Sequence, residues 1–242
     1  MDVRSGRKGR YTSLSLQLTV RERKRVTLSL EKFVSRWPYA YHLTSGNNFR
    51  PIHSSGRLES ASSLLIKAGR VDLAREKRST CMNILVKGVE ISLRDQAPLH
   101  EKNIAFEDRW QFGDLVEALN GLVFFWTGKA SGPNPYGLRH FERYAAESPI
   151  LLRVDNSELL AANPEVTPLF CGFNSGSPRY SNGAASPRGP RTFLDAREFA
   201  GTPRKVVELT FPSDVLLPPT TEYGHSPGGP WTELSEAAVV VD

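Results

Sequence analysis

At 242 residues the chain is long for one small domain and short for two full ones, which favours one α+β core with additions at both ends. Its content of 39% hydrophobic and 24% charged residues is typical of a folded protein and excludes global disorder. No apolar run approaches the roughly 18 residues of a membrane span, and no apolar segment follows the basic N-terminus, so we expect a cytoplasmic protein without membrane contact.

The two cysteines, Cys81 and Cys171, do not have the spacing of a zinc site or of a redox pair. They are also too few for a disulfide framework, which favours a reducing compartment. The sequence therefore predicts neither a structural metal nor a stabilising disulfide.

Residues 1–30 are interpreted as a basic N-terminal extension. The formal net charge is +5, and eight basic side chains occur among the first 25 residues with few acids between them. Lysine and arginine release counterions when they bind phosphates, which favours a nucleic-acid partner, although a solvated basic tail explains the composition equally well. Within the extension, residues 12–20 alternate polar and apolar side chains, as a strand does.

The first half of the core alternates between helical and strand-like periods. Pro38 ends the first helix, because proline cannot continue it. The segment 69–83 is charged and has no clear period. The predicted elements are helices over 27–36, 49–54 and 60–68, and strands over 39–44 and 89–93.

The second half contains a buried strand candidate of β-branched and aromatic residues at 123–126, between Gly121 and Gly128. A stretch rich in Gly, Ser, Pro and Arg over 174–191 predicts a long loop, a feature that is often functional. The other predicted elements are helices over 112–119 and 138–146, a helical turn over 156–160, and strands over 150–154 and 206–211.

These elements indicate an α+β fold, because strands and helices mix without a βαβα rhythm. The sequence has no GxGxxG after a strand and no GxxxxGK[ST], so neither Rossmann nor P-loop nucleotide binding is expected. We divide the chain into the basic extension 1–30, a core domain 31–217 and an irregular Pro- and Gly-rich tail 218–242.

Short motifs between residues 38 and 215 carry a family resemblance. Tyr41-His42-Leu43-Thr44, followed by Asn48, Ile52, Gly56 and Leu58, closely resembles the opening of the DarT-type DNA ADP-ribosyltransferases. A bacterial domain family of uncharacterised function shares this opening. Further pieces similar to that family follow in the same order: Leu93-Arg94-Asp95-Gln96 with Pro98-Leu99, Leu119-Asn120 with Val123-Phe124-Phe125-Trp126, Asn174-Ser175-Gly176, Arg188-Gly189 with Thr192-Phe193, and Val207-Glu208-Leu209.

The resemblance implies an ADP-ribosyltransferase-like split mixed β-sheet core with flanking helices. It also implies an NAD-dependent transferase of the glycosyltransferase class that modifies DNA or RNA, as a toxin or an anti-phage defence factor. Such a reaction breaks the bond between nicotinamide and ribose through a transition state that resembles an oxocarbenium ion. It needs a clamp on NAD, a surface against nicotinamide and a carboxylate near the reacting carbon. No metal is implied.

Three residues are the catalytic candidates that the resemblance suggests. Glu208 lies in an apolar strand, so if Val207 and Leu209 face the core, Glu208 faces a possible cleft; the alternative is a solvent-facing strand acid. His42 would hydrogen-bond the NAD ribose, or is a structural histidine. Arg94 would pair with the pyrophosphate, although its surrounding motif differs from the toxin's, and Asp95 is a candidate salt-bridge partner for it.

Further residues are candidates for holding the two substrates. Thr44 and Asn48 would hold the adenosine end of NAD, with a helix-cap role as the alternative for Asn48. Phe125 and Trp126 would contact nicotinamide, or pack in the core. The loop candidates for the nucleic-acid acceptor are Asn174, Ser175, Arg188 and Arg191.

Two other functions remain open from the sequence. A non-catalytic module with the same fold would bind a nucleotide or nucleic acid, which the departures around Arg94 favour. An RNA 2′-phosphotransferase would also consume NAD, but the several arginines on which that family relies are not all found here.

Overall fold

The computed structural model describes residues 27–236, so the strand expected at 12–20 and most of the basic extension lie outside the described residues. Within 27–236 the fold is α+β, as the sequence predicts. Every helix in this range is too short or too polar to cross a membrane. The α-helices are α1 (Leu30–Arg36), α2 (Gly46–Ser55), α3 (Ala61–Lys67), α4 (Phe112–Asn120), α5 (Pro135–Tyr144) and α6 (Asn156–Ala162).

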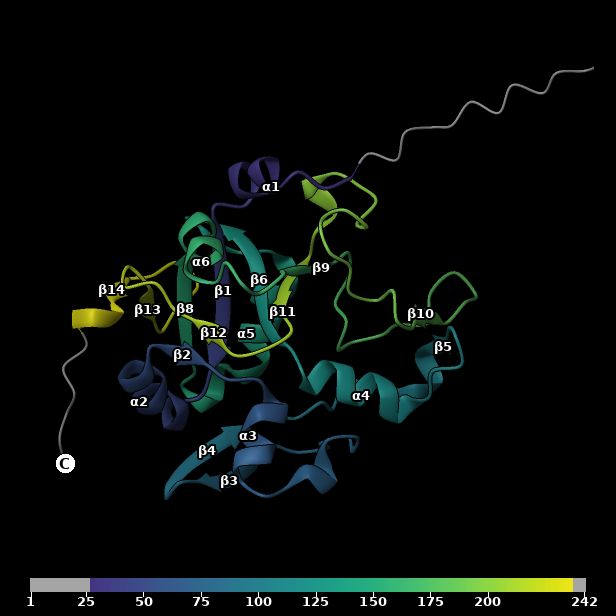
Figure 1. The fold of residues 1–242 in the computed structure, drawn as a ribbon, viewed down its shortest axis with the longest axis horizontal. Helices are drawn as coiled ribbons and strands as arrows, with labels where there is room; N and C mark the ends of the chain where they lie inside the picture. The colour runs from purple at the N-terminus through teal and green to yellow at the C-terminus, as the bar shows by residue number, and fades with distance from the viewer. Residues whose placement is uncertain (1–26, 237–242) are drawn as a thin grey trace, which may run out of the picture.

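An eight-stranded sheet forms the centre of the described chain (Figure 1). Its strand order is β14-β13-β8-β1-β6-β11-β9, with the short β7 paired to β6. Every pairing in it is antiparallel, so the expectation of a mixed sheet is wrong for these residues. The strands are β1 (Tyr39–Thr44), β6 (Val123–Lys129), β7 (Gly132–Pro133), β8 (Ile150–Asp155), β9 (Leu169–Cys171), β11 (Glu208–Phe211), β13 (Glu222–Gly224) and β14 (Thr232–Glu233).

Three two-stranded sheets accompany the central one. The parallel pairing in the described chain joins β5 to β10, while the other two small sheets are antiparallel. Their members are β2 (Arg57–Leu58) with β12 (Val215–Leu216), β3 (Met82–Val86) with β4 (Val89–Leu93), and β5 (Ile104–Phe106) with β10 (Ser186–Arg188). The segment 69–83, which has no clear period, thus contains the start of β3.

Most sequence-predicted elements occur, and their ends are set by local capping. The first helix begins at Leu30, because the Ser29 side chain accepts the N–H of Lys32. The helix expected from 138 begins earlier, at Pro135, because Asn134 caps it. The expectation of an irregular tail from 218 is wrong as far as the described residues reach, because β13 pairs with β8 and extends the central sheet.

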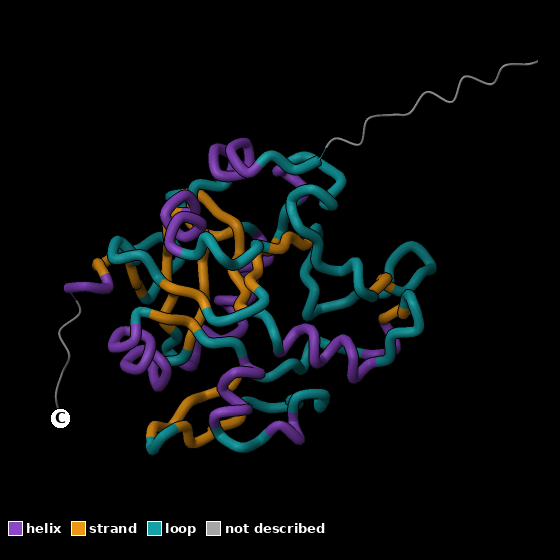
Figure 2. The backbone as a smooth tube through the Cα atoms, in the orientation of Figure 1, coloured by secondary structure: helices purple, strands orange, loops and turns teal. Residues whose placement is uncertain are grey.

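The two faces of the sheet are covered differently. The main core lies on one face, where Phe33 of α1 and Leu159 of α6 belong to one buried cluster with Phe125 and Leu209 of the sheet. A smaller cluster with Tyr41, Tyr144 of α5 and Leu151 covers the other face. Helix α3 and the β3–β4 hairpin share a separate apolar cluster and lie beside the sheet (Figure 1). Figure 2 shows that the chain between β9 and β11 is mostly loop, as expected for residues 174–191.

The central sheet opens between β1 and β6. Strand β1 pairs with β6 only over Tyr39–Tyr41, but it pairs with β8 along its whole length to Thr44. Strand β6 pairs with β11 from Val123 to Trp126. The two middle strands therefore separate beyond Tyr41, and the backbone of 42–44 has a partner strand on one side alone.

Candidate functional site

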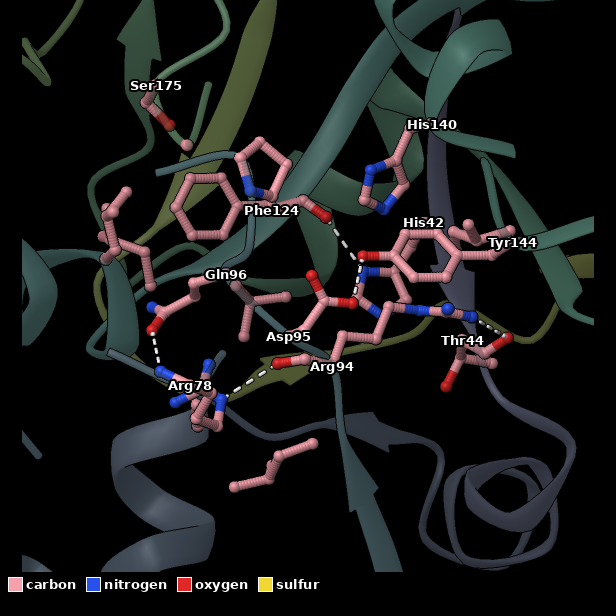
Figure 3. Close-up of a pocket in the computed structure, with 18 of the residues that line it drawn as sticks. His42, Thr44, Arg78, Arg94, Asp95, Gln96, Phe124, His140, Tyr144 and Ser175 are labelled. Carbon is pink, nitrogen blue, oxygen red and sulfur yellow. Dashed lines mark hydrogen bonds between the residues drawn. The ribbon is translucent and has the colours of Figure 1, made fainter. Parts of the chain in front are cut away.

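A pocket of about 300 Å³ lies at the opening between β1 and β6 (Figure 3). Both strands line it, together with the end of β4, helix α5, the loop after β9 and the start of β11. His42 and Glu208, which the sequence analysis assigned to one site, both line this pocket. A volume of this size is at the lower end of the range of small-molecule sites.

His42 bridges the two separated strands. Its Nδ1 lies 2.8 Å from the carbonyl oxygen of Phe124, a bond drawn in Figure 3. Because a carbonyl oxygen can only accept, Nδ1 carries the proton and Nε2 of the neutral ring keeps its lone pair. Burial lowers the pKa of His42 to about 4, and the charge of Arg94 acts in the same direction. At neutral pH the ring is therefore an uncharged acceptor at the pocket.

Glu208 lines the pocket from β11, where it pairs directly with Trp126 of β6. It is 2% exposed, and Leu209 is buried in the main core as expected. The expectation that Val207 also faces the core is wrong, because Val207 precedes the strand and is only half-buried, and Val206 joins the core instead.

Glu208 Oε1 accepts the N–H of Ser175 at 3.1 Å, while Oε2 has no protein partner among the described residues. Burial raises the pKa of Glu208 to about 7, although the nearby Ser175 and the charge of Arg188 act in the opposite direction. The carboxyl therefore exchanges its proton near neutral pH.

The loop that contacts Glu208 is held by Arg188. Arg188 is 1% exposed, and its guanidinium donates to the carbonyl oxygens of Ser175 at 3.2 Å and Asn174 at 3.1 Å. It also donates to Ser186 Oγ at 2.6 Å. These bonds occupy its donors inside the protein, so Arg188 supports the loop instead of reaching toward an acceptor.

The other acceptor candidates in this loop separate into two groups. Asn174 and Ser175 line the pocket as predicted, and the Ser175 hydroxyl is buried without a hydrogen-bond partner among the described residues. Arg191 does not line the pocket; its side chain is 56% exposed and forms an ion pair with Glu198 at 4.0 Å.

Arg94 lines the pocket, but the two terminal nitrogens of its guanidinium are already engaged, while Nε is buried without a hydrogen-bond partner among the described residues. The guanidinium donates to the carbonyl oxygen of Thr44 at 3.1 Å, forms an ion pair with Glu147 at 3.3 Å and lies 4.2 Å over the ring of Tyr144. The expectation that Asp95 is its salt-bridge partner is wrong, because Asp95 pairs with Arg143 at 3.4 Å. Arg94 therefore ties the end of β4 to β1 and α5.

Sequence reasoning missed a polar group on α5. His140 and Tyr144 are four residues apart, so they share one face of the helix, and both line the pocket (Figure 3). Tyr144 Oη donates to Asp95 at 2.7 Å; burial and this carboxylate raise the pKa of Tyr144 to about 12. Burial would raise the pKa of Asp95, but this hydrogen bond and that from the N–H of Ala97 lower it on balance.

The imidazole ring of His140 has no hydrogen bond to another described residue and lies against the rings of Trp126 and Tyr144, at centroid distances of 5.7 and 5.1 Å. Burial lowers its pKa to about 4, helped by the charge of Arg94. It is a second uncharged imidazole at the pocket. The i, i+4 spacing of His140 and Tyr144 on a predicted helix is the signal that could have identified both.

The two candidates for holding the adenosine end of NAD both lie at the pocket, but they differ in whether other protein groups already bind their side chains. Thr44 is 3% exposed and lines the pocket. Asn48 also lines it, but its amide is paired with the backbone of Ser92, donating and accepting at 2.8 Å. The helix-cap alternative for Asn48 is wrong, because the residue before α2 is Ser45 and Asn48 lies inside the helix.

Of the aromatic candidates, Trp126 lines the pocket and Phe125 does not. Phe125 is 1% exposed and packs edge-to-face on Phe211 in the main core, so its side chain lies on the opposite face of the sheet from the pocket. Phe124, two residues before Trp126, lines the pocket with it. An aromatic wall therefore exists, formed by Phe124 and Trp126.

Asn134 connects α5 to the start of β11. Its Oδ1 caps α5 by accepting the N–H of Tyr136 and Gly137, at 2.9 and 3.1 Å. Its Nδ2 donates to the carbonyl oxygen of Val207 at 2.7 Å. One 8%-exposed side chain thus fixes the helix that bears His140 relative to the residue before Glu208.

These features define an α+β protein with a pocket where its antiparallel sheet opens. Residues 38–217 match the family described as "Family of unknown function (DUF7002)", and the chain belongs to this family. Comparisons with curated proteins and with solved structures give no match. Among the described residues, no group of three or more His, Cys, Asp and Glu is arranged to hold a metal ion.

Proposed function

We propose that this protein is an NAD-dependent ADP-ribosyltransferase that modifies nucleic acid, with an ADP-ribosyltransferase-like core. The convergence of His42 and Glu208 on one pocket carries the proposal, because these are the two residues that the DarT resemblance assigns to NAD and to catalysis. The opening of the sheet between β1 and β6 supports the split-sheet part of that resemblance.

The chemistry of the pocket fits NAD in three respects. Nε2 of the neutral His42 ring is an acceptor suited to a ribose hydroxyl. Glu208 Oε2 and Ser175 Oγ are buried polar atoms without protein partners, and such atoms are costly unless a ligand or water pairs with them. Phe124 and Trp126 offer an aromatic surface to a planar nicotinamide ring.

Glu208 is the proposed catalytic carboxylate. In its ionised form it would stabilise the positive charge that develops at the ribose when the bond to nicotinamide breaks. Nicotinamide leaves with the electron pair of that bond, and an acceptor nucleophile forms the new bond to the same carbon. The acceptor proton passes to the Glu208 carboxylate, whose pKa of about 7 suits both taking and releasing it.

His42 is proposed to orient the ribose, and Arg94 to hold the pocket in shape. Because the two terminal nitrogens of Arg94 donate to Thr44 and pair with Glu147, its role is to position β1 and α5, and only its Nε, which has no partner among the described residues, is left for a pyrophosphate oxygen. This engagement is also what favours the second candidate, a non-catalytic module that binds NAD or ADP-ribose without turnover.

The proposal extends to the biological role of a toxin or an anti-phage defence factor, which follows from the resemblance and from the net charge of +5. Growth of a bacterial host expressing the wild type or Glu208→Gln tests this role directly. Growth arrest by the wild type alone supports a toxin, and equal growth of both strains contradicts it.

Incubation with NAD and single-stranded DNA or RNA tests the enzymatic proposal. Free nicotinamide and transfer of label from NAD to the oligonucleotide are expected for the wild type and absent for Glu208→Gln. Glu165→Gln is the matched control, because Glu165 is exposed and does not line the pocket. Binding of NAD without nicotinamide release from any acceptor would support the non-catalytic module instead.

A further inference from the structure

A second hollow, of about 470 Å³, adjoins the pocket between α5 and the loop after β9. The two cavities share Pro98, His140, Asn174 and Ser177, so His140 lies in their common wall. Three residues of the quoted sequence motifs, Pro98, Asn174 and Arg188, lie in its wall, but most of its lining comes from α5 and from residues 177–186, which no motif covers.

The hollow is strongly basic. Arg139, Arg143, Arg179 and Arg188 line it, and none of the acidic residues within 27–236 does. Arg188 is occupied by loop carbonyls and forms the buried part of the lining. We name this cavity the arginine hollow.

The other three arginines differ in how free they are. Arg143 forms an ion pair with Asp95 at 3.4 Å. Arg139 lies 4.8 Å over the ring of Tyr136 and, like Arg179, has no ion pair with any residue that the structure describes. Two guanidinium groups are therefore available to an anion, and a guanidinium can donate two parallel hydrogen bonds to a phosphate.

We infer that the arginine hollow binds the phosphodiester backbone of a single-stranded nucleic acid and delivers one nucleotide to the pocket. Arg139 and Arg179 contact phosphates, and Tyr136, 37% exposed, offers its free ring face to a base. Binding of the nucleic-acid backbone is inferred from the arginine hollow itself, whereas delivery of a nucleotide to Glu208 rests on the proposed transferase function.

The burial of Glu208 decides between single and double strands. Because Glu208 is 2% exposed at the pocket, a base inside a duplex cannot reach it without leaving its stack. A single strand bends into two adjoining cavities without that cost. His140, in the wall shared by the two cavities, then lies between the phosphates in the arginine hollow and the nucleotide in the pocket.

Fluorescence anisotropy of a labelled single-stranded oligonucleotide, without NAD, tests the hollow independently of catalysis. The double variant Arg139→Gln/Arg179→Gln should bind at least tenfold more weakly, and the slope of log K against log salt should decrease by about one for each lost phosphate contact. Arg197→Gln is the matched control, because Arg197 is exposed and lies outside the hollow. A duplex of the same sequence should bind more weakly than the single strand, and an acidic peptide should not compete.

Equal affinity of the double variant and the wild type, or binding of the duplex as tightly as the single strand, would overturn the inference. Competition by the acidic peptide would assign the hollow to a protein partner and overturn it as well. If oligonucleotide binding depends on both arginines but no nicotinamide is released, the hollow stands and the transferase proposal fails. If transfer occurs and the variant leaves the KM for the oligonucleotide unchanged, the hollow fails alone.

Discussion

His42 on β1 and Glu208 on β11 line one pocket, although strand β6 lies between their strands. The relationship depends on the early end of pairing between β1 and β6, which lets the His42 ring bond to the carbonyl oxygen of Phe124 in place of a backbone partner. In an unbroken antiparallel ladder the two side chains would be separated by a full strand. The opening of the sheet is therefore what creates the site.

Replacing Glu208 by Gln should increase stability while removing activity. The folded-state pKa is raised from 4.5 to about 7, so the carboxyl favours folding when protonated, and this contribution is lost as the pH rises through 7. At pH 8 the free energy of unfolding of the variant should be up to about 3 kcal/mol higher than that of the wild type. Denaturation in urea at pH 8 and pH 5 measures the difference, which should shrink at pH 5. A variant that is less stable than the wild type at pH 8 would contradict the burial of an ionised carboxylate.

Two substitutions separate the roles of the His42 nitrogens. Asn places an amide N–H near the position of Nδ1, so His42→Asn should keep the bond to Phe124 and the fold but lose the Nε2 acceptor. We expect kcat/KM for NAD to fall at least tenfold with the melting temperature changed by only a few degrees. His42→Ala should lose both activity and stability. Full activity in His42→Asn would show that Nε2 contacts nothing in the reaction.

Acid should destabilise the protein through its two neutral histidines. The pKa of His42 and that of His140 are both lowered to about 4, so their contributions are complete above pH 6.5 and are lost as the pH falls through 4. Each could cost up to about 3 kcal/mol. Because protonation of Glu208 opposes this loss, urea denaturation is best compared in the Glu208→Gln background. His140→Asn should flatten the decline between pH 6.5 and 5, whereas the exposed His100→Asn should not; equal slopes would argue against a buried neutral His140.

Arg188 and Arg191 should differ although both belong to one basic loop. Arg188→Ala leaves the carbonyl oxygens of Asn174 and Ser175 without donors in a buried region, which should cost about 3 kcal/mol and loosen the Ser175 contact to Glu208. Arg191→Ala removes an exposed side chain and should change the unfolding free energy by less than about 0.5 kcal/mol. Urea denaturation compares the two directly, and equal stability of both variants would refute the supporting role of Arg188.

The strongly patterned parts of the fold were predictable from local sequence. Residues 89–93 alternate apolar and polar side chains, and residues 123–126 are β-branched and aromatic; the structure has these segments as β4 and as the first part of β6. The position of Glu208 opposite the core-facing Leu209 also follows from alternation alone. These patterns are local, so they can be recognised in the sequence without knowing which strands are neighbours.

The remainder depends on contacts between distant segments. The chain at 222–224 is short and close to prolines and glycines, and it becomes a strand only because the edge of β8 is available to pair. Residues 124, 125 and 126 give no local sign of which aromatic faces the pocket, since register with β11 decides it. Likewise, Arg188 looks like any loop arginine until its acceptors, 13 and 14 residues earlier, are seen.

Mass spectrometry of a single-stranded oligonucleotide after incubation with the protein and NAD is the most direct test of the proposed chemistry. We expect the oligonucleotide to gain the mass of one ADP-ribose with the wild type and with Glu165→Gln, and to remain unmodified with Glu208→Gln. An unmodified oligonucleotide with every form of the protein, while NAD remains intact, would contradict the proposal that His42 and Glu208 form the site of an ADP-ribosyltransferase.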